Sequence, residues 1–332
     1  MTSAILVTGG TGFIGAHVVR RLLIRGARVR CLVRPESNRA NLEGLPVDIA
    51  VGDLEDRVSL RRAMEDVETL YHCAADYRLW SRRQGEILRN NVEGTRNVLA
   101  AAAEADVRRI VYTSSVAAVG IEPDGSPATE QTPVRPGDII GEYKRSKHEA
   151  ELVARKAAQE GQPIVIVNPS TPVGEMDIKP TPTGQIIVDF LNRRMPAYVN
   201  TGLNLVDVHD VAEGHLLAAA NGVPGKRYIL GNRNMTLKQL LEMLAEISGI
   251  PAPQVRLPYS VPLAFAAAET AFARITGKPP RAPLDAVRMS RHRMFFDASL
   301  AVRELGLPQS PVEAALERAV SWFRDRGYAR AA

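Results

Sequence analysis

Short apolar runs alternate with amphipathic segments through the first half of the chain. Runs rich in β-branched and aliphatic residues predict strands at 4–8, 28–33, 68–73, 108–113 and 163–168. Apolar residues at helical spacing predict helices between them, at 13–24, 86–105 and 143–160. Strands that alternate with helices are typical of a parallel sheet covered on both faces. We therefore expect an α/β fold with a doubly wound parallel sheet.

The strict alternation stops near residue 170, where prolines become frequent. Within a short span lie Pro169, Pro172, Pro180 and Pro182. Beyond them, the pattern predicts helices at 208–220, 236–248 and 311–326. We expect one domain at 1–170, onto which 204–222 packs back, and a smaller mixed C-terminal lobe formed by 171–203 and 223–332.

The composition excludes several classes of protein. Of the 332 residues, 45% are hydrophobic and 24% are charged, as in an ordinary globular protein. The Lys and Arg residues behind the net charge of +5 are spread through the chain without interleaved aromatics, so no nucleic-acid partner is expected. Cys31 and Cys73 lie in separate apolar runs, which favours neither a disulfide nor a metal site. No apolar run is long enough to span a membrane and no signal peptide is recognisable, so a cytoplasmic location is expected.

A glycine-rich turn follows the first predicted strand. The chain runs Gly9-Gly10-Thr11-Gly12-Phe13-Ile14-Gly15 between that strand and the next helix. Glycines at this spacing allow a tight turn, a close approach of the backbone to a pyrophosphate, and close packing of the helix on the strand. The helix N-terminus adds free amides and its positive dipole end. The turn therefore predicts a Rossmann-type dinucleotide site, held by Gly9, Thr11, Gly12, Phe13, Ile14 and Gly15.

The residue after the second strand bears on which nicotinamide cofactor binds. An NAD site usually carries an acid there, which binds the ribose 2′-hydroxyl. This chain has Arg34, and an arginine suits a 2′-phosphate. We therefore expect NADP, with NAD as the alternative if Arg34 is only a solvated surface charge. Asp53 and Leu54, at the expected end of the third strand, are placed to hold the adenine.

A tyrosine and a lysine one helical turn apart are the candidate catalytic pair. Tyr143 and Lys147 lie on one face of the helix 143–160. A tyrosine pKa of about 10 is too high for a base at neutral pH, and a neighbouring ammonium favours the phenolate. Tyr143 can then exchange a proton with a substrate hydroxyl while a hydride moves between substrate carbon and cofactor. Ser115, after the strand 108–113, could polarise the substrate oxygen, with Thr113 and Ser114 as alternatives.

With these motifs, the chain resembles the extended (atypical) short-chain dehydrogenases/reductases of the NAD-dependent epimerase/dehydratase family over nearly its whole length. The matching stretches are 8–15, 52–54, 72–75, 91–95, 113–115, 143–147 and 206–212. The resemblance implies that Ser115, Tyr143 and Lys147 are catalytic. It also implies cofactor contacts, made by Ala74, Ala75, Thr113, Pro169, Ser170 and Thr171. A homodimer formed through the helices 86–105 and 143–160 follows from the resemblance as well.

A closer resemblance is to the hopanoid-associated sugar epimerases, relatives of dihydroflavonol 4-reductase. It is carried by the stretches 75–80, 168–174, 179–184 and 195–202. It implies a small sugar or polyol-like substrate, with a lipid-linked one among the options, in hopanoid lipid biosynthesis. The side chains expected near that substrate are Asp76, Tyr77, Trp80, Ser115 and Asn168. For the first three, the alternative is a packed loop whose polar groups are bonded within the protein.

Two reaction types stay open. A dehydratase of this superfamily needs an acid after the catalytic serine, where this chain has Val116, Ala117 and Ala118. Epimerisation and net ketone reduction both remain as candidate reactions. Arg34 favours a reductase that uses NADPH. A non-catalytic NADP-binding sensor is a third reading.

An uncharged apolar segment at 257–268 continues into a helix with further apolar residues. At helical spacing lie Val261, Phe265, Ala268, Phe272 and Ile275. Such a stripe is typical of a core-facing or dimer-facing helix. The alternative is an apolar wall or membrane-surface contact for a lipid-linked substrate, with the protein peripheral to the inner membrane.

Overall fold

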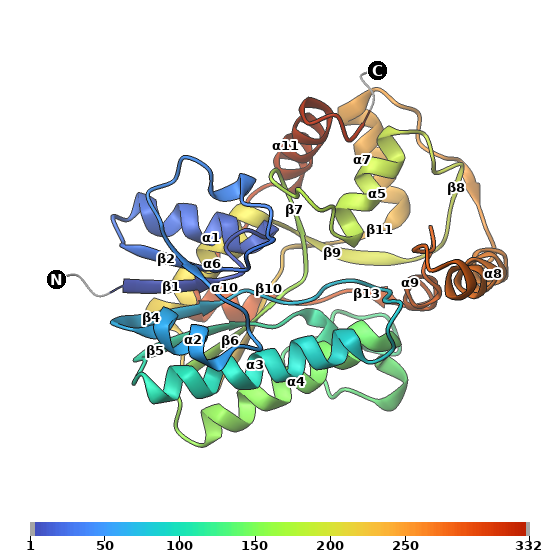
Figure 1. Ribbon diagram of the computed structural model, residues 1–332. Helices are drawn as coiled ribbons and strands as arrows, with labels where there is room; N and C mark the ends of the chain where they lie inside the picture. The colour runs from blue at the N-terminus through green and yellow to red at the C-terminus, as the bar shows by residue number, and fades with distance from the viewer. Residues whose placement is uncertain (1–3, 330–332) are drawn as a thin grey trace.

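The computed structural model describes residues 4–329, which fold around a seven-stranded parallel sheet (Figure 1). The strands, in the sheet order β10-β6-β5-β4-β1-β2-β3, are Arg227–Leu230, Ile164–Pro169, Arg109–Thr113, Val67–His72, Ala4–Thr8, Val29–Val33 and Asp48–Val51. The chain order reverses between β1 and β4. In open α/β sheets, ligands bind outside the carboxyl ends of the strands at such a switch point.

Helices cover both faces of this sheet, as the alternating pattern predicts. One face carries α1 (Phe13–Ile24), α6 (Val208–Asn221) and α10 (Ser299–Leu305). The other carries α2 (Arg57–Met64), α3 (Glu86–Glu104) and α4 (Gly141–Gln159). Because successive strand residues point to opposite faces, Val7 joins the first core and Leu6 the second.

The smaller lobe has its own core beside the carboxyl ends of these strands (Figure 1). Its four-stranded sheet comprises β7 (Thr171–Val173), β9 (Gly202–Asp207), β11 (Arg233–Thr236) and β13 (Arg293–Met294). Packed in its core are the helices α5 (Pro182–Leu191), α7 (Leu237–Ser248) and α11 (Val312–Asp325). At its outer edge lie β8 (Ala197–Tyr198), β12 (Val255–Arg256), α8 (Ser260–Thr276) and α9 (Leu284–Met289).

The expected division of the chain needs correction. Of the range 204–222, helix α6 packs on the large sheet, whereas residues 204–207 belong to β9 in the sheet of the lobe. However, β10 pairs in parallel with β6, and α10 packs against β10 and α6. The range 223–332 therefore contributes to both cores rather than to the lobe alone. Within residues 4–329, no helix is long and apolar enough to cross a membrane.

Candidate active site

The glycine turn has the geometry that a bound pyrophosphate requires. Gly9 has a φ of +71°, and a Cβ there would lie 2.6 Å from the backbone nitrogen of Ala74. A Cβ on Gly15 would overlap the carbonyl oxygen of Gly9. Helix α1 starts after Gly12 with no side chain capping it, so its first amides are open to an anion. The turn therefore fits a dinucleotide.

A buried polar link joins this turn to the end of β4. Thr8 Oγ1 lies 2.7 Å from His72 Nδ1 and accepts a 3.3 Å hydrogen bond from the amide of Ala74. Burial lowers the pKa of His72 to about 3, so the ring is neutral. The link holds Ala74 and Ala75 beside the glycines, which brings together two stretches predicted to contact one cofactor.

The residues expected at the adenosine end follow β2 and β3. Arg34 is exposed, and its guanidinium lies 3.5 Å from the equally exposed carboxylate of Glu36. A solvated pair of this kind is weak, so the arginine can turn to another anion. The amide of Asp53 donates to Ser59 Oγ over 3.2 Å, and the Leu54 side chain packs against Gly94. Both residues closely follow β3, whose carboxyl end lies on the same side of the parallel sheet as that of β1.

Helix α4 carries the candidate catalytic pair. Lys147 is buried, and its Nζ donates a 3.0 Å hydrogen bond to the carbonyl of Thr113 and lies 5.6 Å from the ring centre of Tyr112. Burial lowers the pKa of Lys147 to about 8, although the carboxylate of Glu151 opposes this. Burial also raises the pKa of Tyr143, whereas a hydrogen bond with Ser115 lowers it. The hydrogen bond with Ser115 therefore favours the phenolate form of Tyr143.

Three neighbouring hydroxyls were candidates for polarising the substrate, and their contacts differ. Thr113 Oγ1 lies 2.9 Å from His215 Nε2 in a buried pair. Ser114 Oγ is buried and donates to Glu151 Oε2 over 2.6 Å. Ser115 is partly exposed and is the one that interacts with Tyr143. The geometry therefore favours Ser115.

A buried carboxylate that sequence reasoning missed supports this serine. Glu151 Oε2 also accepts a 2.7 Å hydrogen bond from Asn168 Nδ2, which lies 3.0 Å from the carbonyl of Ser115. Glu151 Oε1 pairs with Arg227 of β10 at 3.0 Å. Asn168 was expected to touch substrate, but it is fully buried beneath Ser115 and positions that residue instead. The four-residue spacing of Lys147 and Glu151 on one helix face was the available signal.

The loop after β4 holds the other expected substrate residues. The carboxylate of Asp76 pairs with Arg78, whose Nε lies 2.9 Å away. The backbone amide of Asp76 donates to Asn91 Oδ1 over 2.7 Å. The hydroxyl of Tyr77 donates to the carbonyl of Lys179 over 3.0 Å. These two polar groups are thus occupied by protein partners, while Trp80 is partly exposed.

The segment expected beside the nicotinamide spans β6 and β7. Pro169 is buried, whereas Ser170 and Thr171 are partly exposed. The hydroxyl of Ser170 and Oδ1 of Asn168 are both enclosed and have no hydrogen-bond partner among the described residues. Of these two residues only Ser170 is partly exposed, so its hydroxyl is the one that a polar ligand could satisfy.

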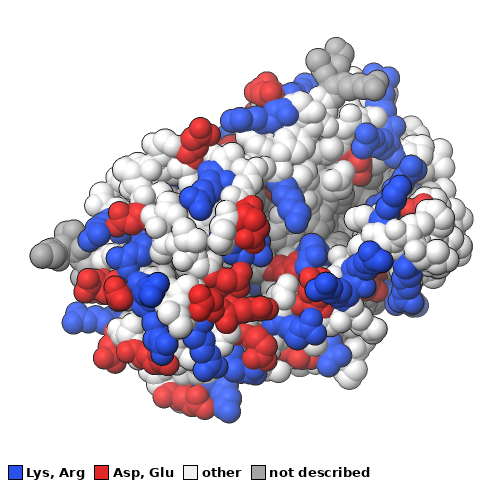
Figure 2. Space-filling model, viewed as in Figure 1, with Lys and Arg blue, Asp and Glu red and all other residues white. Residues whose placement is uncertain are grey.

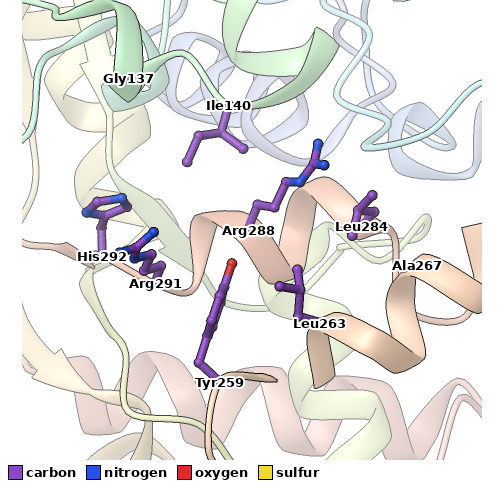
Figure 3. A pocket seen from close by; sticks show the side chains of 9 residues that line it. All are labelled: Gly137, Ile140, Tyr259, Leu263, Ala267, Leu284, Arg288, Arg291 and His292. Carbon is purple, nitrogen blue, oxygen red and sulfur yellow. The ribbon is translucent and has the colours of Figure 1, made fainter. Parts of the chain in front are cut away.

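A pocket of about 540 Å³ lies between α8, α9 and the segment that precedes α4 (Figure 3). Its lining residues are Gly137, Ile140, Tyr259, Leu263, Ala267, Leu284, Arg288, Arg291 and His292. Ile140 faces Tyr259 and Leu263 across it and comes three residues before Tyr143. Sequence reasoning pointed to the apolar segment 257–268 but not to this cavity.

One cluster outside the site has ligand-like side chains. Atoms of His17, Glu175 and His209 lie within 4.8 Å of one another. However, the Glu175 carboxylate is already held by Arg318 at 3.0 Å and by His209 Nε2 at 2.8 Å. Arg318 also binds Asp207 at 2.6 Å. The cluster is therefore an ion-pair network that joins α1, α6 and α11.

The NAD dependent epimerase/dehydratase family model matches residues 5–231. The chain is 52% identical to a dihydroflavonol 4-reductase named in Synechocystis, over 99% of this chain and 97% of that protein. It is 39% identical to sterol demethylase protein B of Methylococcus capsulatus, over 97% and 98% of the two chains. The solved structure of gox2253 superposes with a TM-score of 0.89 at 47% identity, over 99% and 100%. The chain therefore belongs to the NAD-dependent epimerase/dehydratase family of extended short-chain dehydrogenases/reductases, and it is an NAD(P)-dependent enzyme.

Proposed function

We propose that the protein is an NADPH-dependent reductase that converts a ketone of an amphiphilic substrate into a secondary alcohol. The observation that carries this is the meeting of Ser115, Tyr143 and Lys147 at the carboxyl edge of β5 and β6, beside the glycine turn. NADPH, when bound, supplies the hydride that adds to the carbonyl carbon. Tyr143 donates its proton to the carbonyl oxygen, which Ser115 polarises by hydrogen bonding.

Lys147 has two tasks in this scheme. Its ammonium stabilises the phenolate that remains on Tyr143 after proton transfer, because a positive charge one helical turn away favours the anion. It is also the residue that would hold the nicotinamide ribose. The carbonyl of Thr113 fixes its Nζ at 3.0 Å, which reduces the freedom lost when a ligand binds.

The choice of NADPH over NADH rests on Arg34. Its side chain is 61% exposed and, within residues 4–329, has the solvated Glu36 carboxylate as its one partner. A guanidinium binds a 2′-phosphate through two parallel hydrogen bonds. The reductase name of the Synechocystis relative supports a net reduction.

For the substrate, we propose a small molecule with a polyol-like head and an apolar part, made in hopanoid lipid biosynthesis. The partly exposed Trp80 suits the head. The sterol named for the Methylococcus relative supports an apolar part. A strain that lacks the gene should accumulate the unreduced ketone in its lipid extract, detectable by mass spectrometry.

Epimerisation of a sugar carbinol is the second candidate, supported by the family to which the chain belongs. An epimerase would oxidise the carbinol to a ketone, allow the ketone to rotate in the site, and return the hydride to the opposite face of the ketone. Elimination of water is not proposed, because the turn after Ser115 is the apolar 3-10 helix Val116–Ala118.

A deuterium experiment separates these activities. The pure enzyme is incubated with 4-deuterated NADPH and a panel of ketones and sugars, and products are analysed by mass spectrometry. Deuterated alcohol with consumption of cofactor supports the reductase, whereas epimers at constant cofactor support the epimerase. Tyr143→Phe should abolish transfer, and Tyr198→Phe, on β8, should not. Tight NADPH binding with no product from any compound would instead favour a sensor.

We also propose a homodimer formed through α3 and α4, which lie side by side on one face of the sheet (Figure 1). Leu152 of α4 is 46% exposed although it is a large apolar residue. Leu152→Asp should therefore convert the dimer into a monomer, measured by light scattering after gel filtration. A wild type that is already monomeric would refute this assembly.

A further inference from the structure

Helix α8 presents an apolar face to solvent. The exposed fractions are 50% for Val261, 52% for Phe265, 63% for Phe272 and 83% for Ile275. At 100° per residue these four side chains fall within an arc of about 80°. The two residues of this helix that are buried, Ala266 and Ala273, lie on another side. This face of α8 is therefore an apolar surface without a partner among the described residues.

The charge around this helix is one-sided. The range 256–293 holds seven Lys and Arg and two Asp and Glu, a net charge of +5 that equals the net charge of the whole chain. The rest of the chain is therefore neutral overall. Figure 2 shows blue side chains gathered around the white rim where α8 lies in Figure 1. Arg288 and Arg291 line the pocket behind α8, whereas the other cations of this range, together with the apolar stripe, have the composition of a helix that lies in an anionic lipid surface.

The other side of α8 lines a pocket that reaches the segment before α4, the helix that carries Tyr143. Leu263 and Ala267 line the pocket of about 540 Å³, and Ile140 closes it from the segment that leads into α4. Helix α9 is packed tightly on that segment, since a Cβ on Gly141 would lie 2.5 Å from a carboxylate oxygen of Asp285. One helix thus separates the exposed apolar face from a cavity that is also lined by Ile140, three residues before Tyr143.

We propose that α8 docks on an anionic bilayer surface and that the pocket behind it receives the apolar part of a substrate drawn from that bilayer. The choice of substrate rests on the function proposed above, whereas bilayer docking does not. A second copy of the chain is a poorer occupant, because a two-fold contact through α8 would set the same cations against each other. An anionic surface complements both the stripe and its charge.

Co-sedimentation of the full chain with vesicles tests the docking. Vesicles of phosphatidylcholine alone are compared with vesicles that also contain phosphatidylglycerol. The wild type should bind the anionic vesicles, and Phe265→Glu/Phe272→Glu should lower the partition coefficient at least tenfold. The matched control Ile24→Glu/Val58→Glu, at two exposed apolar positions of α1 and α2, should leave binding unchanged.

The charges are tested separately. Each cation near an anionic surface strengthens binding by about fivefold, so Lys278→Gln/Arg281→Gln should weaken it by about 25-fold. The control Arg61→Gln/Arg62→Gln, on α2, should have no such effect. NADPH affinity, measured by fluorescence, should be the same in all these variants and shows that they are folded.

A series of 2-alkanones of increasing length tests the pocket. We expect kcat/KM to rise by up to about fourfold per methylene while the chain fills the cavity, and Leu263→Asn to flatten that rise. A wild type that binds neither kind of vesicle overturns the docking. If Phe265→Glu/Phe272→Glu then dissociates a dimer, the apolar face instead contacts a second copy of the chain. A flat length series in an active enzyme overturns the substrate class alone. Vesicle binding by a protein with no hydride transfer overturns the proposed function and leaves the docking in place.

Discussion

Replacing Glu151 tests whether a buried charge holds the site together. Its carboxylate accepts hydrogen bonds from Ser114 and Asn168 on one oxygen and pairs with Arg227 on the other. These partners lie on or just after β5, β6 and β10, so one side chain joins the ends of three strands. In Glu151→Gln the amide keeps one acceptor for Ser114 and Asn168, but it turns an NH₂ group toward the guanidinium.

The magnitude follows from the burial of the pair. The side chains of Glu151 and Arg227 are 3% and 15% exposed. Removing one partner of a buried ion pair costs about 3–5 kcal/mol, because the other charge stays buried without compensation. Arg227 retains the carbonyl of Glu130, at 2.7 Å from its Nε, so we expect the lower part of this range, about 3 kcal/mol.

Urea unfolding followed by circular dichroism measures this free energy. The double variant Glu151→Gln/Arg227→Gln removes both charges, so it should recover at least about 1 kcal/mol relative to the sum of the two single changes. The kcat of Glu151→Gln should fall as well, since Asn168 then supports Ser115 less firmly. A loss of stability below about 1 kcal/mol, or strictly additive single changes, would refute the role assigned to the pair.

Three further predictions concern the cofactor, the catalytic lysine and the lobe. Arg34→Glu should weaken NADPH binding by about 10- to 100-fold and leave NADH binding nearly unchanged in fluorescence titrations, with Arg39→Glu as a control that changes neither. Because burial lowers the pKa of Lys147 to about 8, its ammonium is lost above that pH, and kcat/KM should fall about tenfold per pH unit there; a profile flat to about pH 10 would contradict this. Burial raises the pKa of Asp177 from 3.8 to about 6, so the folded state binds more protons between these values and stability decreases as pH rises through them. Asp177→Asn should remove that dependence and raise the free energy of unfolding by about 3 kcal/mol at pH 7, and a destabilised variant at that pH would contradict it.

Local patterns predicted the parts of the fold that local physics determines. β1 and α1 have the bounds expected from the apolar run at 4–8 and the helical spacing at 13–24. The glycine turn between them fixes where the strand ends and where the helix begins. The strand β10 was not predicted. It has four residues and lies after the region where alternation stops, so its pairing with β6 depends on distant parts of the chain. The same holds for α10, which completes the core against α6.

The candidate site likewise has features that local sequence determines and features that depend on distant residues. Spacing could place Tyr143 and Lys147 on one face of a helix, but it could not choose among three adjacent hydroxyls at the end of β5. That choice depends on His215 of α6, Glu151 of α4 and the partly exposed position left to Ser115. Long-range partners also determine where Asn168 lies, since the carboxylate that holds Ser114 accepts a hydrogen bond from Asn168, which is fully buried and donates to the carbonyl of Ser115. A short motif therefore identifies which residues can react, while the buried groups around them decide which residue reaches the substrate.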